Sequence, residues 1–164
     1  MRKVYYTDEN VKAWVHDIMR DLAKDNWKPT YVVGLTRGGL TPTLMISHYL
    51  DIPMETLKVS LRDDINGPES NLWMAEHAFN GEQILIVDDI NDSGATLNWI
   101  KNDWQTSCLP NDPKWEGIWN HNVRFATLVN NEASEFKDVD YTGISINKVE
   151  NPQWIVFPWE NWWH

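Results

Sequence analysis

Two adjacent carboxylates follow a short run of aliphatic residues in the middle of the chain. Residues 84–87 (ILIV) predict a buried strand, and Asp88 and Asp89 come directly after it. Two carboxylates so close together repel each other unless a cation or a group rich in hydroxyls lies against them. A magnesium ion and a cis-diol would both meet this requirement. The pair therefore indicates a binding site at the end of this strand.

The five residues 92–96 (DSGAT), which lie just beyond the acidic pair, have the types that bind a phosphate. Ser93 and Thr96 carry hydroxyls, and a glycine turn before a helix leaves backbone N–H groups accessible to an anion. The helix that the sequence predicts from about residue 96 to 104 adds the attraction of its dipole. A polar turn capped by Asp92 or Ser93 is the purely structural interpretation. It explains the turn but not the acidic pair before it.

A second glycine turn lies earlier in the chain, after another predicted strand. Residues 31–35 (YVVGL) are a β-branched run typical of a buried strand, and Thr36, Arg37, Gly38 and Gly39 follow it. Taken alone, two glycines in a row mark a sharp turn. An arginine beside exposed backbone amides is also suited to binding a pyrophosphate. The turn is therefore a second candidate binding element.

Strands and helices alternate along the chain in an order that would bring the two turns together. Apolar residues spaced by three and four over residues 8–24 predict a first helix, with Thr7 as its N-cap. Further helices are predicted over 40–50 and 96–104, and strands over 31–35, 54–61, 84–87, 123–129, 141–146 and 154–157. Repeated strand, turn and helix units predict an α/β fold with a doubly wound, mostly parallel sheet, whose ligands bind beyond the carboxyl ends of the strands. Both glycine turns fall at that edge.

Length and composition limit the classes of protein that the chain can belong to. Its 164 residues, 19.2 kDa in all, predict one domain over residues 1–164. No apolar run reaches the roughly 18 to 20 residues that cross a bilayer, so we expect no membrane partner and a cytoplasmic location. The net charge of -10 argues against nucleic acid as a partner. We expect most of the 11 tryptophans to be anchors in the core or in an oligomer interface.

Residues 84–96 (ILIVDDINDSGAT) resemble the phosphoribosyl pyrophosphate motif of the type I phosphoribosyltransferases. That motif is a hydrophobic strand, two acids, two variable residues, and then Asp, Thr or Ser, Gly, any residue, and Thr or Ser. The resemblance implies the fold of that family, a mostly parallel twisted sheet flanked by helices, with a mobile lid loop and a small base-binding hood. The polar residues 62–71 would form the lid.

The resemblance also implies a role for each residue of the two turns. Asp88 and Asp89 would hold the ribose hydroxyls of phosphoribosyl pyrophosphate, and Asp89 would also bind Mg²⁺, the expected cofactor. Residues 92–96 would hold the 5-phosphate, and the earlier turn would hold the pyrophosphate. Asp92 would in addition be the catalytic residue, which takes the proton from the attacking base. The expected residues for phosphoribosyl pyrophosphate are thus Thr36, Arg37, Gly38, Gly39, Asp88, Asp89, Asp92, Ser93, Gly94, Ala95 and Thr96.

Within this family the chain is most similar to the short xanthine-guanine phosphoribosyltransferases. In that branch an aromatic ring stacks on the purine and the backbone of the next residue reads its edge, roles that would fall to Trp154 and Ile155. A tryptophan in the core is the alternative for Trp154. A lysine that recognises the purine 6-oxo group is expected just after the strand 123–129, but this chain has Asn131 there. An amide can donate a hydrogen bond but carries no charge, so the accepted base stays open.

The activity implied by the resemblance is a phosphoribosyl transfer in purine salvage. The substrates would be phosphoribosyl pyrophosphate and guanine, xanthine or hypoxanthine, and the products a nucleoside 5'-monophosphate and pyrophosphate. Relatives in the family also suggest a homodimer or a homotetramer. Two alternatives remain, a nucleotide sensor that has this fold without the activity, and a transferase that uses a different base.

Overall fold

The computed structural model describes residues 1–59, 68 and 70–163. Helices and strands alternate over most of this length, as the sequence predicts. Their bounds are β1 (Arg2–Tyr5), α1 (Asp8–Lys24), β2 (Tyr31–Thr36), α2 (Leu40–Leu50), β3 (Met54–Lys58), α3 (Leu72–Phe79), β4 (Ile84–Asn91), α4 (Ala95–Ser107), the 3-10 helix η1 (Pro113–Gly117), β5 (Val123–Asn131), β6 (Tyr141–Ile146) and β7 (Gln153–Val156).

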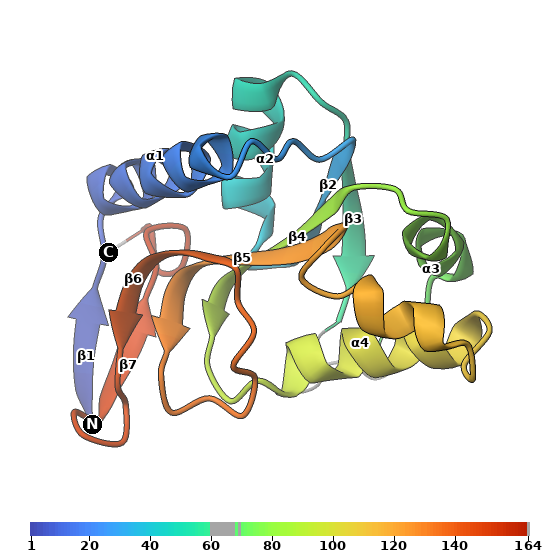
Figure 1. The fold of residues 1–164 in the computed structure, drawn as a ribbon. Helices are drawn as coiled ribbons and strands as arrows, with labels where there is room; N and C mark the ends of the chain where they lie inside the picture. The colour runs from blue at the N-terminus through green and yellow to red at the C-terminus, as the bar shows by residue number, and fades with distance from the viewer. Residues whose placement is uncertain (60–67, 69, 164) are drawn as a thin grey trace.

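Five of the strands form one parallel sheet in the order β3-β2-β4-β5-β6 (Figure 1). Strand order reverses direction between β2 and β4, which leaves a crevice at the carboxyl ends of these two strands. β1 and β7 pair with each other in a separate two-stranded parallel sheet at one side of the molecule. The prediction of an α/β fold with a mostly parallel sheet flanked by helices is confirmed.

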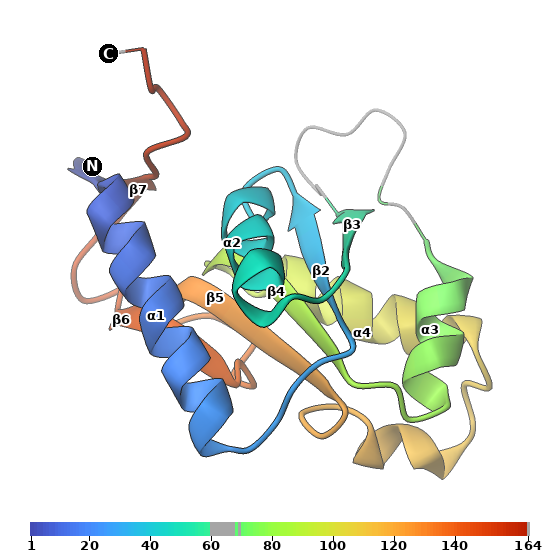
Figure 2. The ribbon, with the colours of Figure 1, turned by 90° about the horizontal axis from the view of Figure 1, so that it is seen from above.

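Helices cover both faces of the five-stranded sheet, as Figures 1 and 2 show. Successive side chains of a strand point to opposite faces, so Val32 and Val33 of β2 belong to two different cores. Val32 packs with buried residues of α1 and α2, whereas Val33 packs with those of α3 and α4. A strand buried on both faces needs an unbroken apolar run, which is why residues 84–87 lack the alternation of a half-exposed strand.

The ends of β4 and β5 differ from the predicted strands in a way that shapes the site. β4 runs on to Asn91, so the acidic pair lies inside the strand rather than after it. β5 continues to pair with β4 as far as Asn91, whereas the pairing of β2 with β4 stops at Val87. The last four residues of β4 therefore have a strand on one side only. The other side is open, and the two carboxylates lie at that opening.

Three elements, β1, α3 and the 3-10 helix η1, have no counterpart among the predicted ones. β1 is only four residues long, and its partner β7 comes from the opposite end of the chain, so local periodicity gives no sign of it. α3 follows the polar segment, and the side chain of Asn71 caps it by accepting a hydrogen bond from the Met74 N–H at 3.4 Å. The predicted strand 54–61 is realised as Met54–Lys58, and most of the predicted lid 62–71 lies outside the described residues.

The tryptophans divide between the core and the surface. Trp104 and Trp115 are fully buried and pack with Trp119 and Phe125 beneath α4. These rings fill the core on that face, as predicted for most of the tryptophans. Trp162, near the C-terminus, is 75% exposed. No helix in the described part of the chain combines the length and the apolar character needed to cross a membrane.

Candidate active site

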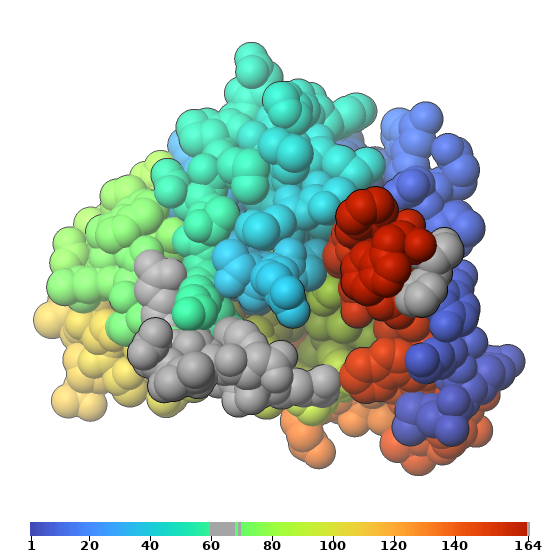
Figure 3. Space-filling model, turned by 180° about the vertical axis from the view of Figure 1, so that it is seen from behind, coloured from blue at the N-terminus to red at the C-terminus, as the bar shows by residue number. Residues whose placement is uncertain are grey.

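A pocket of about 350 Å³ lies at the carboxyl ends of β2 and β4. The start of α4 forms one wall, and β7 with the segment that follows it forms the opposite wall. In Figure 3 the green end of β4 is seen between the cyan segment that leads into α2 and the red C-terminal segment. This is the position at which the topology predicts a ligand.

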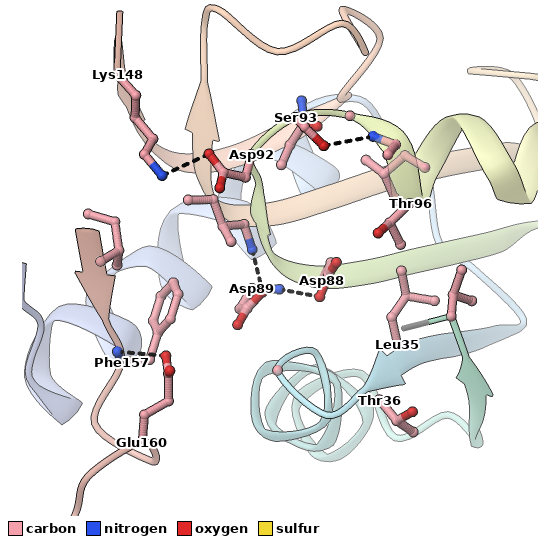
Figure 4. A pocket seen from close by; sticks show the side chains of 18 of the residues that line it. Leu35, Thr36, Asp88, Asp89, Asp92, Ser93, Thr96, Lys148, Phe157 and Glu160 are labelled. Carbon is pink, nitrogen blue, oxygen red and sulfur yellow. Dashed lines mark hydrogen bonds and ion pairs between the residues drawn. The ribbon is translucent and has the colours of Figure 1, made fainter. Parts of the chain in front are cut away.

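The structure brings most of the predicted site residues to this one pocket (Figure 4). The predicted residues that line it are Thr36, Gly38, Asp88, Asp89, Asp92, Ser93, Gly94, Ala95, Thr96, Trp154 and Ile155. Three predicted residues are not among the described lining: Arg37, which is exposed, and Gly39 and Asn131, which are buried behind it. Lys148 and Glu160 also line the pocket, although neither is among the site residues predicted from the sequence.

The acidic pair sits on the floor of the pocket in an electrostatically unfavourable state. Burial, together with the charge of the neighbouring Asp89, holds the pKa of Asp88 well above its usual range. Burial also raises the pKa of Asp89, although its Oδ1 accepts a hydrogen bond from the Ile90 N–H at 2.7 Å. No ion pair joins either carboxylate to a basic side chain among the described residues, and two hard oxygen donors fit a magnesium ion. A cation or a hydroxyl-rich group bound at this place would relieve the repulsion between the two carboxylates.

The turn 36–39 packs directly against this pair. The peptide bond between Thr36 and Arg37 is cis. A Cβ placed on Gly38 would overlap the carboxyl group of Asp89, and one on Gly39 would overlap the carbonyl oxygen of Val87. Glycine is thus required at both positions by the close approach of β4 rather than by a special backbone angle. The two motifs, 50 residues apart in the sequence, form one surface.

The turn before α4 has the geometry of an anion site. Gly94 has a φ of 91°, in the left-handed region, and α4 begins at the next residue, so that its first residues, Ala95 and Thr96, line the pocket. The Ser93 hydroxyl oxygen accepts a hydrogen bond from the Ala95 N–H at 3.2 Å, which tightens the turn. The loop after β5 supports it from behind, since the Glu135 N–H donates to the Ser93 carbonyl at 2.9 Å. N–H groups of the first turn of a helix and two hydroxyls can together bind a phosphate.

Asn131 supports the site but does not face the ligand space. Its Nδ2 donates to the backbone carbonyl of Asp92 at 3.0 Å, and its Oδ1 accepts from the backbone N–H groups of Ala133 and Lys148 at 3.2 and 3.0 Å. The residue is only 7% exposed. Both the oxygen and the nitrogen of this amide are hydrogen-bonded to backbone groups, so the side chain holds the backbone in place. The geometry gives no support to the prediction that Asn131 contacts the base.

Lys148 is the residue that the sequence interpretation missed. It lies in the turn between β6 and β7, and its Nζ forms an ion pair of 2.9 Å with Asp92 Oδ1. The same Nζ lies 5.6 Å from the centroid of the Trp154 ring. No motif surrounds it, because only the folding of β7 beside the end of β4 brings it to the pocket. In the sequence, only its closeness to Trp154, six residues further on, links Lys148 to a predicted site residue.

Comparisons with known proteins agree with this geometry. The phosphoribosyl transferase domain family matches residues 2–161, which include both glycine turns, the acidic pair and the β7 wall. The chain belongs to this phosphoribosyltransferase family. It is 31% identical over 159 residues to the xanthine-guanine phosphoribosyltransferase of Cereibacter sphaeroides, an alignment that covers 94% of this chain and 81% of the relative.

Solved phosphoribosyltransferase structures share the fold over nearly the whole chain. The purine phosphoribosyltransferase of Pyrococcus horikoshii has a TM-score of 0.69 and 25% identity, covering 98% of this chain and 96% of its own. The xanthine-guanine-hypoxanthine phosphoribosyltransferase of Helicobacter pylori has a TM-score of 0.66 and 19% identity, covering 98% and 95%. The type I phosphoribosyltransferase fold predicted from residues 84–96 is confirmed, and the residue roles within the pocket stay predictions.

Proposed function

We propose that this phosphoribosyltransferase transfers the 5-phosphoribosyl group of phosphoribosyl pyrophosphate to a 6-oxopurine, a reaction of purine salvage. The observation that carries the proposal is the convergence of the acidic pair, the turn before α4 and Trp154 on one pocket. Each supplies one part of what the two substrates need: a partner for the ribose hydroxyls, an anion site and an aromatic face. The names of the relatives from Cereibacter sphaeroides and Pyrococcus horikoshii support a purine as the acceptor.

In the proposed reaction a ring nitrogen of the purine attacks the anomeric carbon of the ribose. The new bond joins this nitrogen to the carbon, and the bond between the carbon and the pyrophosphate oxygen breaks with its electron pair. The nitrogen loses its proton, and Asp92, which lines the same pocket as Trp154, would accept it. The N–H groups at the start of α4 and the hydroxyls of Ser93 and Thr96 would hold the 5-phosphate throughout the reaction.

Mg²⁺ is part of the proposal, and Asp89 with Asp88 would hold it. When bound, the ion supplies positive charge that favours departure of the pyrophosphate. The two carboxylates fit this role because burial and their mutual repulsion disfavour both being charged without a cation. Arg37, exposed at the rim in the turn beside Gly38, would add a donor for the pyrophosphate.

The proposal is tested by product formation from phosphoribosyl pyrophosphate and Mg²⁺ with six bases in parallel. Guanine, xanthine and hypoxanthine are expected to give nucleotides, whereas adenine, uracil and orotate are not. Asp92→Asn should lower kcat by about 100-fold or more, the usual contribution of a positioned proton acceptor. Asp17→Asn, the same change on α1, is the matched control and should leave kcat unchanged.

A different result would select one of the alternatives. If phosphoribosyl pyrophosphate raises the Tm of the wild-type protein but no base gives product, the fold serves as a nucleotide sensor. If a pyrimidine or adenine gives product and the 6-oxopurines do not, the assignment of the acceptor is wrong.

A further inference from the structure

We propose that Lys148 selects the base in this pocket, by donating a hydrogen bond to a ring carbonyl oxygen of the acceptor. The inference rests on the proposed function and deepens it. It assigns base recognition to the turn between β6 and β7, away from Asn131 at the end of β5.

The ammonium of Lys148 lies between the two groups that would contact a base. Its Nζ is 2.9 Å from Asp92 Oδ1 on one side and 5.6 Å from the Trp154 ring centroid on the other. Figure 4 shows the side chain extending toward Asp92 across the pocket wall. A flat ring that enters the space bounded by Asp92 and Trp154 therefore meets this ammonium.

The charge balance of the pocket gives this lysine a distinct role. Among the described residues that line the pocket there are four carboxylates, on Asp88, Asp89, Asp92 and Glu160, and Lys148 is the one cation. An ammonium carries three N–H donors and no acceptor. It can pair with a carbonyl oxygen on a purine ring but not with an exocyclic amino group, which is also a donor. The site therefore favours purines that have a carbonyl group, rather than an amino group, at position 6.

The backbone around Lys148 is fixed, so the ammonium is presented in a defined direction. The Lys148 N–H donates to Asn131 Oδ1 at 3.0 Å. The side chain of Asn147 accepts from the N–H groups of Val149 and Glu150 at 3.0 and 3.1 Å. Asn131 also binds the Asp92 carbonyl, so one buried amide ties together the backbones of both members of the ion pair. Asn131 is thus a positioning residue, and Lys148 provides the charged contact.

The ion pair between Lys148 and Asp92 is more buried than an ion pair on the protein surface. The Lys148 side chain is 17% exposed and that of Asp92 30%, whereas the pair Arg20 and Asp17 on α1 is 56% and 39% exposed. A half-buried lysine that faces a ligand space loses hydration which a substrate oxygen can replace. The ion pair with Asp92 then sets the ammonium beside the group that would accept the proton of the base.

The test compares binding of inosine 5'-monophosphate and adenosine 5'-monophosphate by isothermal titration calorimetry. The two share the ribose 5-phosphate and differ at purine position 6, where one has a carbonyl and the other an amino group. Wild-type protein should prefer the oxo nucleotide, and Lys148→Met should lower that preference by about tenfold or more, as expected for loss of a hydrogen bond to a charged donor. Lys148→Arg should retain most of it, because the charge and the donors remain.

Two further measurements keep the outcome decisive. Lys137→Met is the matched control, since Lys137 Nζ donates to the Glu132 carbonyl outside the pocket lining, and it should bind both nucleotides as the wild type does. Affinity for phosphoribosyl pyrophosphate should change by less than about threefold in Lys148→Met, which also shows that the variant is folded. An unchanged preference in Lys148→Met, or an equal loss for both nucleotides, would overturn the inference. Failure of the wild type to bind phosphoribosyl pyrophosphate would instead overturn the proposed function itself.

Discussion

The two ends of the pocket are built in different ways. At the phosphate end, defined by Gly38, Asp89 and Gly94, backbone segments approach one another so closely that a single methyl group has no room. At the base end, defined by Asp92, Lys148 and Trp154, side chains from three separate parts of the chain meet across open space. Changes at the first end should therefore weaken binding of phosphoribosyl pyrophosphate, and where backbone is crowded, as at Gly94, they should also destabilise the fold. Changes at the second should alter how the base is bound, chosen or deprotonated, and should leave the fold intact.

The largest effect is expected for Gly94→Ala. A Cβ at Gly94 would overlap the Phe136 N–H and come within 2.7 Å of Ser134 Oγ, and the backbone is in the left-handed region. Overpacking and the unfavourable φ should together cost about 3 to 4 kcal/mol in the free energy of unfolding, measured with urea. Binding of phosphoribosyl pyrophosphate should be lost as well.

Gly81→Ala is the matched control for this substitution. Gly81 has nearly the same φ, 89° against 91°, but apart from its chain neighbours no described residue has an atom within 4 Å of an added Cβ. It should cost only about 1 kcal/mol, the contribution of the backbone angle alone. Equal costs for the two variants would show that the phosphate end is not closely packed and does not differ in this respect from the base end.

The next largest effect is expected for Gly38→Ala, which acts on the ligand more than on the fold. The added methyl group would displace the Asp89 carboxyl from the pocket floor. Affinity for phosphoribosyl pyrophosphate with Mg²⁺ should fall by about 100-fold, as for loss of a buried charged contact. Gly117→Ala, where the Cβ meets nothing within 4 Å, should leave that affinity unchanged in the same titration.

The difference between the two ends of the pocket also explains which parts of the site could be predicted from the sequence. The phosphate end lies within two short stretches, 36–39 and 88–96, each directly after an apolar strand, so motif and fold could be inferred together. The base end could be inferred only in part. Trp154 follows from the resemblance, but Lys148 reaches the pocket through the pairing of β7 with β1 and the hydrogen bonds of Asn131. These contacts join residues far apart in the chain, which no local pattern encodes.

The end of β4 is another feature that the local sequence could not predict. The extension of β4 to Asn91 depends on pairing with β5, and the end of its pairing with β2 at Val87 opens the site. The apolar run predicts the buried half of the strand correctly. It cannot show where a neighbouring strand stops, since that depends on tertiary packing rather than on propensity.

A smaller effect is expected at the base end for Trp154→Leu. The ring is 42% exposed at the pocket, so its loss should cost little stability. Affinity for inosine 5'-monophosphate should fall about tenfold, the usual contribution of stacking a base on an aromatic ring, while phosphoribosyl pyrophosphate binding stays unchanged. Trp162→Leu, at a ring that is 75% exposed, is the control and should change neither affinity. A loss of both ligands in Trp154→Leu would show that the two ends are not separable.

The smallest effect concerns the acidic pair and the pH dependence of stability. Burial raises the pKa of Asp89 to about 6, above its value in the unfolded chain, so the folded protein binds more protons between about pH 4 and 6. The contribution of this group to the free energy of unfolding should therefore be largest below about pH 4 and decline as the pH rises through 6. Asp89→Asn, which stays neutral, should be about 1 kcal/mol more stable than the wild type at pH 7.5 without Mg²⁺ and lose this advantage at pH 4.5.

Asp17→Asn provides the matched control for that comparison, because it makes the same change on the exposed side of α1. Urea titrations of the three proteins at the two pH values measure the effect. Adding Mg²⁺ with phosphoribosyl pyrophosphate should reverse the order at pH 7.5, since a ligand that requires the ionised carboxylate stabilises only the wild type. An Asp89→Asn protein that is less stable at both pH values, with or without ligand, would mean that the pair serves packing. The unfavourable charge at the phosphate end would then have no link to binding, and the difference between the two ends would be one of geometry alone.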